Sequence, residues 1–226
     1  YIIHFMSNPL LQEYNTVFET VPFNDIKESH FLPALKEAIK EAKAEVNTIT
    51  SGSDAPSFEN TIEALEASGE RVSKVAEVFF NLNSAETNDE IQKIAREFSP
   101  LLTEYGNDIL LNESLFKRVQ IVYQQKDQLD LNAEEQMLLD KTYKGFIRNG
   151  AALSEDDKLK LRELDKELGQ LSLQFGENVL AATNAFEMVL ENDQLDGLPQ
   201  DIIDAAAEEA ESREYNDKYV FTLQYP

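Results

Sequence analysis

Apolar residues recur at spacings of three and four along most of the chain, and this pattern predicts amphipathic helices. The first stripe follows Pro33, a residue that suits the first turn of a helix, and a loop over 51–56 ends it. A second helix is expected over 57–83. Gly69 interrupts that helix and predicts a bend or a close contact with a neighbouring element.

Polar capping residues mark the beginnings of three further helices. Thr87 has capping-box spacing to the glutamate three residues later, and the helix that follows should be kinked by Pro100. Asn112 and Asn132 are expected to begin the next two helices. Gly150 should close the second of these as a left-handed C-cap.

The longest helix is expected to begin at Ser154 and to end near Asn184. Its apolar positions alternate by three and four: Leu161, Leu164, Leu168, Leu171 and Phe175. This seam lasts barely two heptads, which favours a long packing helix over an independent dimerising coiled coil. Gly169 and Gly176 lie beside the seam, where small residues would let another helix approach closely.

The two ends of the chain show different patterns. Pro9 and Pro22 interrupt the first 31 residues, which are expected to form an extended arm. Alternating residues over 186–190 and 219–225 predict two strands that pair as a small ribbon, with a short Ala-rich helix between them. A two-stranded ribbon is marginal alone, and no further element is expected to cover it. The fold class is therefore mainly α with a small two-stranded β ribbon.

Composition limits the partners. The chain carries 20 basic and 43 acidic side chains, a net charge of −23. Nucleic acid and anionic membranes bind concentrated basic faces, and no such face is visible, so both are disfavoured. No apolar run reaches the length needed to span a bilayer. Cysteine is absent, which excludes disulfides and thiolate zinc sites within this chain. A reduced compartment is compatible with that absence, and a cytoplasmic protein is expected.

Metal-binding and catalytic patterns are equally scarce. The two histidines, His4 and His30, do not form a His-Glu-x-x-His helix. His30 stands at a helix entrance and is interpreted as a cap or a surface residue. The adjacent acidic pairs Asp156-Asp157 and Glu208-Glu209 point to different sides of a helix and are interpreted as solvated.

The segment 192–197 resembles the start of an EF-hand loop. Gln194 stands at its third position, and Ile203 stands at the twelfth, where a bidentate glutamate is required. Calcium binding is therefore rejected. We predict no catalytic, no cofactor-binding and no metal-binding residue in this chain.

Several segments, in order along nearly the whole chain, resemble the thimet oligopeptidase family of zinc metallopeptidases. The longest is Val-Phe-Phe-Asn-Leu-Asn-Ser-Ala-Glu-Thr-Asn-Asp-Glu at 78–90, and Pro-Ser-Phe-Glu-Asn-Thr-Ile at 56–62 also matches strongly. The other matching segments are 8–11, 22–27, 30–34, 99–102, 138–143, 146–151, 171–180, 197–199 and 219–226. The resemblance points first to the bacterial peptidyl-dipeptidases and then to oligopeptidase A.

The resemblance implies a helical enzyme of two lobes with a channel between them. In the family, zinc held by His-Glu-x-x-His and a later glutamate hydrolyses short peptides, and peptidyl-dipeptidases release C-terminal dipeptides. These ligands are expected beyond Pro226, in a C-terminal catalytic lobe. The full-length parent is expected to bind zinc and to be a monomer. This piece alone is expected to form one channel wall, to hold no zinc tightly and to be inactive.

The same resemblance sets the expected domain organisation. Residues 1–31 are the extended N-terminal arm, 32–184 the helical N-terminal lobe, and 185–226 a β/α segment truncated at the start of the catalytic portion. Met6-Ser7-Asn8 is a more natural start than Tyr1, which makes 1–5 a candidate cloning remnant. Two other interpretations stay open: a stand-alone acidic helical module that binds peptides or partners, and an acidic structural bundle without ligand.

Overall fold

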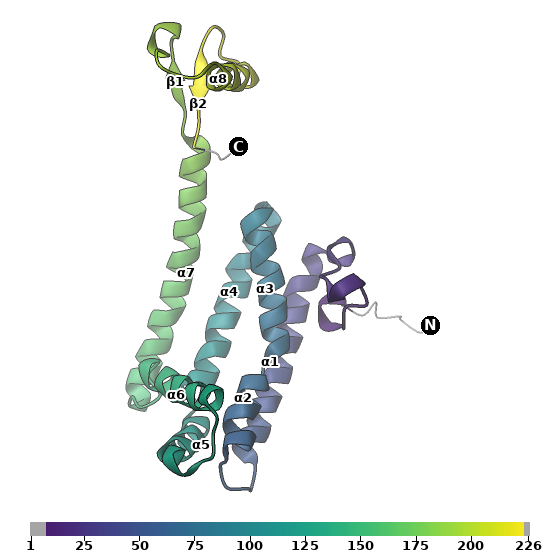
Figure 1. Ribbon diagram of the computed structural model, residues 1–226, viewed down its shortest axis with the longest axis vertical. Helices are drawn as coiled ribbons and strands as arrows, with labels where there is room; N and C mark the ends of the chain where they lie inside the picture. The colour runs from purple at the N-terminus through teal and green to yellow at the C-terminus, as the bar shows by residue number, and fades with distance from the viewer. Residues whose placement is uncertain (1–7, 224–226) are drawn as a thin grey trace. The chain divides into compact units, whose positions relative to one another are not determined.

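The computed structural model describes residues 8–223, and most of them are helical (Figure 1). The prediction of a mainly α fold with a small two-stranded ribbon is confirmed. The predictions for residues 1–5 and for the last residues of the second strand lie at least partly outside the described range. The chain divides into two compact units, Tyr1–Gln170 and Leu171–Pro226, which are described separately. The domain boundaries expected at 31/32 and 184/185 remain predictions.

The N-terminal arm contains three short 3-10 turns, at Pro9–Leu11, Val17–Glu19 and Phe23–Asp25, and it is anchored at Leu10, which is fully buried. Helix α1 spans Glu28–Ser51 and so begins five residues before Pro33, contrary to the expected start.

The earlier start of α1 has a visible cause at His30. The Lys27 backbone N–H donates to the Nδ1 atom of His30 over 3.1 Å, which caps the first turn. The Asn8 side chain donates to the His30 carbonyl over 2.7 Å and ties the arm to the helix. The interpretation of His30 as a cap is confirmed.

Helices α1, α3 (Glu70–Ala85) and α4 (Asp89–Leu110) lie side by side (Figure 1). Phe31, Phe79 and Phe98, one from each helix, are at most 1% exposed and pack ring against ring. The Phe79 and Phe98 rings are stacked with centroids 4.3 Å apart. The core of the three helices therefore includes the first two residues of the 78–90 segment, Val78 and Phe79.

The helix expected over 57–83 is broken at Gly69. A π-helical turn η4 (Phe58–Glu63) continues into α2 (Ala64–Ala67), and α3 begins after Gly69, whose φ is +74°. The Gly69 N–H donates to the Glu45 carboxylate over 2.9 Å. A Cβ atom at this position would lie closer than 3.0 Å to the Tyr105 hydroxyl. The expected close contact is confirmed, and a left-handed residue makes the turn.

A second cluster joins the far end of α1 to η4, α5 (Glu113–Gln124) and α6 (Ala133–Arg148). Its buried members are Val46, Ile49, Phe58, Ile62, Leu115, Phe116, Val119, Val122, Leu139, Phe146 and Ala151. Two of the three expected caps form: Asn112 accepts from the Leu115 N–H over 2.9 Å, and Asn132 forms a capping box with Glu135. Gly150 has a φ of +91° and closes α6, as predicted.

The cap of α4 differs from the prediction by one residue. Asn88, not Thr87, is the N-cap, because its Oδ1 atom accepts from the Ile91 N–H over 2.9 Å. The Asn88 side chain also donates to Glu28 at the start of α1 over 2.9 Å. The buried Thr87 hydroxyl has no hydrogen-bond partner within residues 8–223. The contact between Asn88 and Glu28 on α1, which the spacing of residues near Thr87 does not reveal, favours Asn88 as the cap.

Helix α7 (Glu155–Ala185) is the expected long helix, but its leucine seam is not the face that packs in this chain. Arg162 and Gly169 contact α4: the guanidinium reaches Asp108, and a Cβ at Gly169 would lie 3.2 Å from the Thr103 hydroxyl. At 100° per residue, this face lies roughly 130° around the helix axis from the seam. The close approach expected beside Gly169 is confirmed, whereas Gly176 has no atom within 4 Å.

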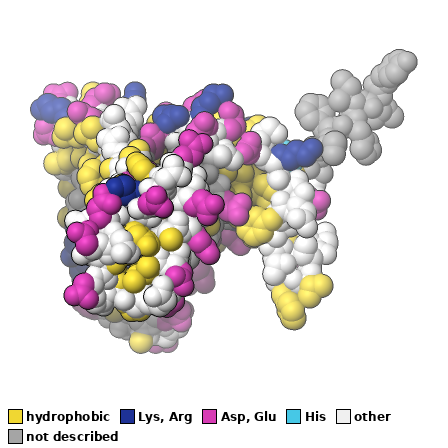
Figure 2. All heavy atoms as spheres, turned by 90° about the horizontal axis from the view of Figure 1, so that it is seen from above, with side chains coloured by type: hydrophobic (Ala, Val, Ile, Leu, Met, Phe, Trp, Pro, Cys, Tyr) yellow, Lys and Arg dark blue, Asp and Glu magenta, His cyan; other side chains and the backbone are white. Residues whose placement is uncertain are grey.

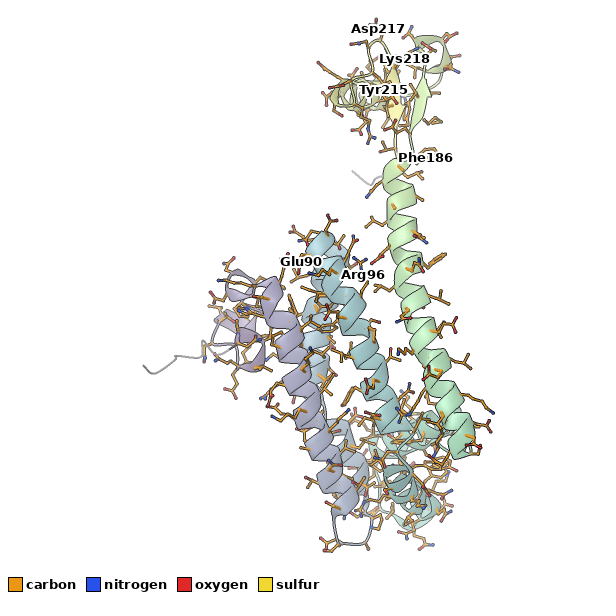
Figure 3. The ribbon with its side chains drawn as sticks, turned by 180° about the vertical axis from the view of Figure 1, so that it is seen from behind. Glu90, Arg96, Phe186, Tyr215, Asp217 and Lys218 are labelled. Carbon is orange, nitrogen blue, oxygen red and sulfur yellow. The ribbon has the colours of Figure 1, made fainter. Side chains whose placement is uncertain are left out.

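The second unit holds the end of α7, β1 (Met188–Leu190), α8 (Gln200–Ser212) and β2 (Tyr219–Phe221). The strands pair antiparallel, with Val189 opposite Val220. The expectation that nothing covers the ribbon is wrong, because α8 packs on β2 and buries Val220 against Ala206 and Ala210. Figure 3 shows Phe186 directly after α7, and Tyr215 and Lys218 in the segment that leads into β2.

Candidate functional site

A groove within the first unit brings together charged side chains from three helices. It has a volume of about 570 Å³ and is lined by α1, α4 and the first half of α7. Its charged lining residues are Lys36, Glu97, Glu104, Arg162, Glu163 and Lys166, and its apolar floor includes Pro100 and Leu101. Pockets that hold small ligands have volumes of about 300–1,000 Å³, so the groove is large enough for part of a short peptide.

One carboxylate fixes the walls of this groove relative to one another. Asp108 on α4 accepts from the Lys43 ammonium of α1 over 2.7 Å and from the Arg162 guanidinium of α7 over 2.8 Å. Arg162 also donates to the Asn107 carbonyl over 3.2 Å. These contacts connect three helices that are far apart in the sequence, and we call them the Asp108 clamp.

The electrostatics of the clamp favour the ion pair. Partial burial opposes the charge on Asp108, but hydrogen bonds and charge attraction from Lys43 and Arg162 hold the pKa of its carboxyl below the ordinary value. The carboxylate therefore stays ionised at neutral pH. Its hydrogen-bond capacity is directed at the two cations, so Asp108 is suited to holding helices together rather than to proton transfer.

A second polar network lies at the η4 turn, within the 56–62 segment. The Asn60 Oδ1 atom accepts from the Ser57 N–H over 2.9 Å and from the Arg118 guanidinium of α5 over 2.9 Å. The Asn60 side chain donates to the Ala55 carbonyl over 2.9 Å. The Arg118 Nε atom is buried without a partner within residues 8–223. The strongly matching 56–62 segment is thus a structural junction between η4 and α5.

The residues considered as metal ligands in the sequence lie apart in the structure and have other roles. His30 caps α1, and His4 lies outside the described residues. In the segment that resembles an EF-hand loop, the Gln194 side chain accepts from the Glu191 N–H over 2.8 Å. Within residues 8–223, no group of three or more His, Asp or Glu side chains is placed to hold a metal ion. The prediction that the chain has no site residue remains a prediction.

Neither the Asp108 clamp nor the Asn60 network was found by sequence reasoning. Arg162 and Asp108 are 54 residues apart, and Arg118 and Asn60 are 58 apart, so no local spacing reveals either pair. The only signal that the sequence offers for either network is a polar residue that stands within an apolar helical pattern.

Acidic side chains are spread over the molecular face seen in Figure 2, with basic side chains in fewer places. Among residues 8–223, none of the helices has both the length and the apolar composition that crossing a bilayer requires.

Known proteins with similar sequences match almost the entire chain. The dipeptidyl carboxypeptidases of Escherichia coli and Salmonella typhimurium are 37% and 36% identical over 218 residues, which is 96% of this chain. Oligopeptidase A of Haemophilus influenzae is 30% identical over 224 residues, or 98% of the chain. The resemblance to the thimet oligopeptidase family is confirmed. No protein-family model matches the chain.

The chain spans about a third of the length of these relatives, 32% in each of the three. This share fits the prediction that the chain corresponds to the N-terminal portion of a thimet oligopeptidase family member. The order predicted among the branches, dipeptidyl carboxypeptidase before oligopeptidase A, is also confirmed. The groove and the Asp108 clamp therefore lie in a chain that is similar to about a third of each of these peptidases.

Proposed function

We propose that the chain is the non-catalytic N-terminal part of a cytoplasmic zinc metallopeptidase that hydrolyses short peptides and releases C-terminal dipeptides. One observation carries the proposal: two proteins named dipeptidyl carboxypeptidase match 96% of this chain at 36–37% identity. The absence of cysteine is in keeping with a reduced compartment. The partner of the chain is the remaining two thirds of the polypeptide, which contains the catalytic lobe.

The described residues do not fit a zinc ion. Catalytic zinc needs three protein ligands, usually His or Glu, directed at one point. His30 uses its Nδ1 atom to cap α1, and no suitable group of ligands exists within residues 8–223. In this proposal the metal and its ligands belong to the rest of the enzyme, and this chain supplies no step of the hydrolysis.

The role of this chain is to form one wall of the substrate channel. The groove over α1, α4 and α7 supports this role, because it combines an apolar floor with side chains of both charges. A short peptide carries an ammonium at one end and a carboxylate at the other. Lys36 and Lys166 would attract the carboxylate, and Glu97 and Glu104 the ammonium. The Asp108 clamp keeps the wall in shape.

The test compares the 226-residue chain with the full-length gene product that contains it. Both are incubated with a short peptide that has a free C-terminus, and the products are separated by chromatography and identified by mass. The full-length protein should release dipeptides, lose activity with a chelator and regain it with zinc. The chain alone should be inactive. Chelator-sensitive cleavage by the chain alone would contradict its assignment as non-catalytic.

Two further outcomes separate the alternatives. If the full-length protein cleaves peptides at internal bonds, its proposed activity is that of an oligopeptidase and not dipeptide release. A gene product that cleaves no peptide would favour the stand-alone acidic helical module.

The channel-wall role has a test of its own in the full-length protein. Lys166→Glu reverses a charge in the groove, whereas Lys160→Glu reverses one on an exposed side chain of the same helix outside it. Lys166→Glu should raise KM several-fold at unchanged kcat, and Lys160→Glu should change neither. Equal effects of the two variants on KM and kcat would contradict the proposal that the groove lines the substrate channel.

A further inference from the structure

Helix α7 exposes a continuous row of large apolar side chains. Leu164, Leu168, Leu171, Phe175 and Val179 follow one another at spacings of four, three, four and four, which places them on one face of the helix. Their exposed fractions are 62%, 62%, 53%, 70% and 48%. We call this face the α7 stripe. Scattered exposed leucines are ordinary, but a contiguous row marks an interaction surface.

The polar composition of α7 changes along the same stretch. Between residues 168 and 185 the only charged residue is Glu177, although 28% of the whole chain is charged. A helix that stays in water normally carries charged side chains on its outer face. Charge is also depleted at the centre of permanent interfaces. From Leu168 onward, the stripe and its surroundings therefore have the composition of a buried contact.

The stripe is also distinct from the face that α7 uses within this chain. Arg162 and Gly169 hold α7 against α4 through the Asp108 clamp and the close approach at Thr103. These residues are on another side of the helix from the stripe. Each side chain of the stripe is at least 48% exposed, so no described element of its own unit covers it.

We propose that the α7 stripe is the surface on which the remaining two thirds of the full-length polypeptide packs. This inference rests on the proposed function. The matched relatives are about three times as long as this chain, since it covers 32% of each. A second copy of the chain is a poor occupant, because two chains of net charge −23 repel each other. A charge-depleted apolar face suits a permanent contact within one polypeptide.

The experiment uses thiol protection, because the chain has no cysteine of its own. Phe175→Cys places a thiol on the stripe. Leu159→Cys places one at a control position on the same helix, 63% exposed and outside the stripe. Each variant is made both in the 226-residue chain and in the full-length protein. Alkylation of the introduced thiol is timed, and the modified peptide is identified by mass. Leu168→Cys is a second stripe position if Phe175→Cys prevents folding.

In the 226-residue chain, both thiols should react rapidly. In the full-length protein, the thiol at position 175 should react at least about tenfold more slowly, because reaction then requires local opening. The thiol at position 159 should keep its rate. Equal rates at position 175 in the two proteins would overturn the proposal, and so would equal protection at position 159. Concentration-dependent protection in the 226-residue chain alone would assign the stripe to a second copy instead.

Peptide cleavage by the same full-length samples separates the two proposals. If the full-length protein cleaves peptides and the thiol at position 175 is not protected, the proposed function stands. Only the proposal that the α7 stripe is a packing surface is then wrong. A gene product without peptidase activity removes the proposed function, whatever the alkylation rates are.

Discussion

Replacing Gly69 with alanine is expected to destabilise the first unit by about 2–5 kcal/mol, the sum of a backbone cost and a steric cost. The backbone cost comes from the φ of +74°, a left-handed conformation that costs an L-residue about 1–2 kcal/mol. The steric cost arises because the new Cβ would lie closer than 3.0 Å to the Tyr105 hydroxyl. Overpacking of this kind costs about 1–3 kcal/mol.

The two costs can be separated with Tyr105→Phe. That change removes the hydroxyl, and the next ring atom lies 3.6 Å from the position of the new Cβ atom, an ordinary contact. In the Tyr105→Phe background, Gly69→Ala should therefore cost only the backbone part, about 1–2 kcal/mol. The coupling energy between the two changes should be about 1–3 kcal/mol. The Tyr105 hydroxyl stays neutral in the assay, because burial and the nearby Glu45 raise its pKa.

Urea unfolding followed by far-UV circular dichroism gives the free energies, and hydrogen exchange of the α3 amides shows whether the loss lies in the first unit. Gly106→Ala is the matched control. Gly106 lies inside α4 with no atom within 4 Å of a new Cβ, so alanine should stabilise by about 0.5–1 kcal/mol. The reasoning is refuted if Gly69→Ala behaves like Gly106→Ala, or if Tyr105→Phe recovers nothing.

Three further changes probe the other contacts. Asn60→Ala should lower the free energy of unfolding by about 2–3 kcal/mol in urea, because it removes one half of the capping box of η4 and one hydrogen bond of the Arg118 guanidinium, which keeps its bond to the Asp54 carbonyl; a loss below about 0.5 kcal/mol would contradict this role. Gly150→Ala should cost about 2 kcal/mol or more, since φ is +91° and a Cβ would meet the Leu161 and Leu153 side chains within 3.0 Å, whereas Gly145→Ala, with open space around it, should not destabilise. Asp108 has a folded-state pKa below its ordinary 3.8, so its stabilising contribution is complete above that value and is lost as pH falls through the folded value. Thermal unfolding should therefore show Asp108→Asn less stable than the parent at pH 7, with a difference that shrinks below pH 3.8, and a difference that does not change with pH would refute the ion-pair account.

The helices and most of their ends could be predicted because their signals are local. Asn112 and Asn132 cap helices through their own side chains, and Gly150 adopts the left-handed conformation that glycine permits. The two strands were recognisable from alternation, although each extends over only three residues. The pairing of those strands followed from their being the two candidates.

The errors come from contacts between distant segments. Local spacing favoured Thr87 as the cap of α4, but Asn88 is the cap, and its side chain also donates to Glu28 on α1. The start of α1 was expected at Pro33, whereas the arm supports a start at Glu28 through Asn8 and His30. The Asp108 clamp was missed for the same reason, since its three residues come from α1, α4 and α7.

The apolar seam of α7 shows what the spacing of hydrophobic residues can and cannot predict about a helix. Spacings of three and four correctly identified one apolar face, but they carry no information about which element covers it. The structure shows that α7 meets α4 through Arg162 and Gly169, on a side of the helix with no apolar repeat. A polar clamp and a glycine contact are enough to position the helix, while the face of greatest apolar area stays exposed. Since apolar burial supplies most of the stability of a helix in a protein, the α7 stripe is the face from which a further partner would gain the most.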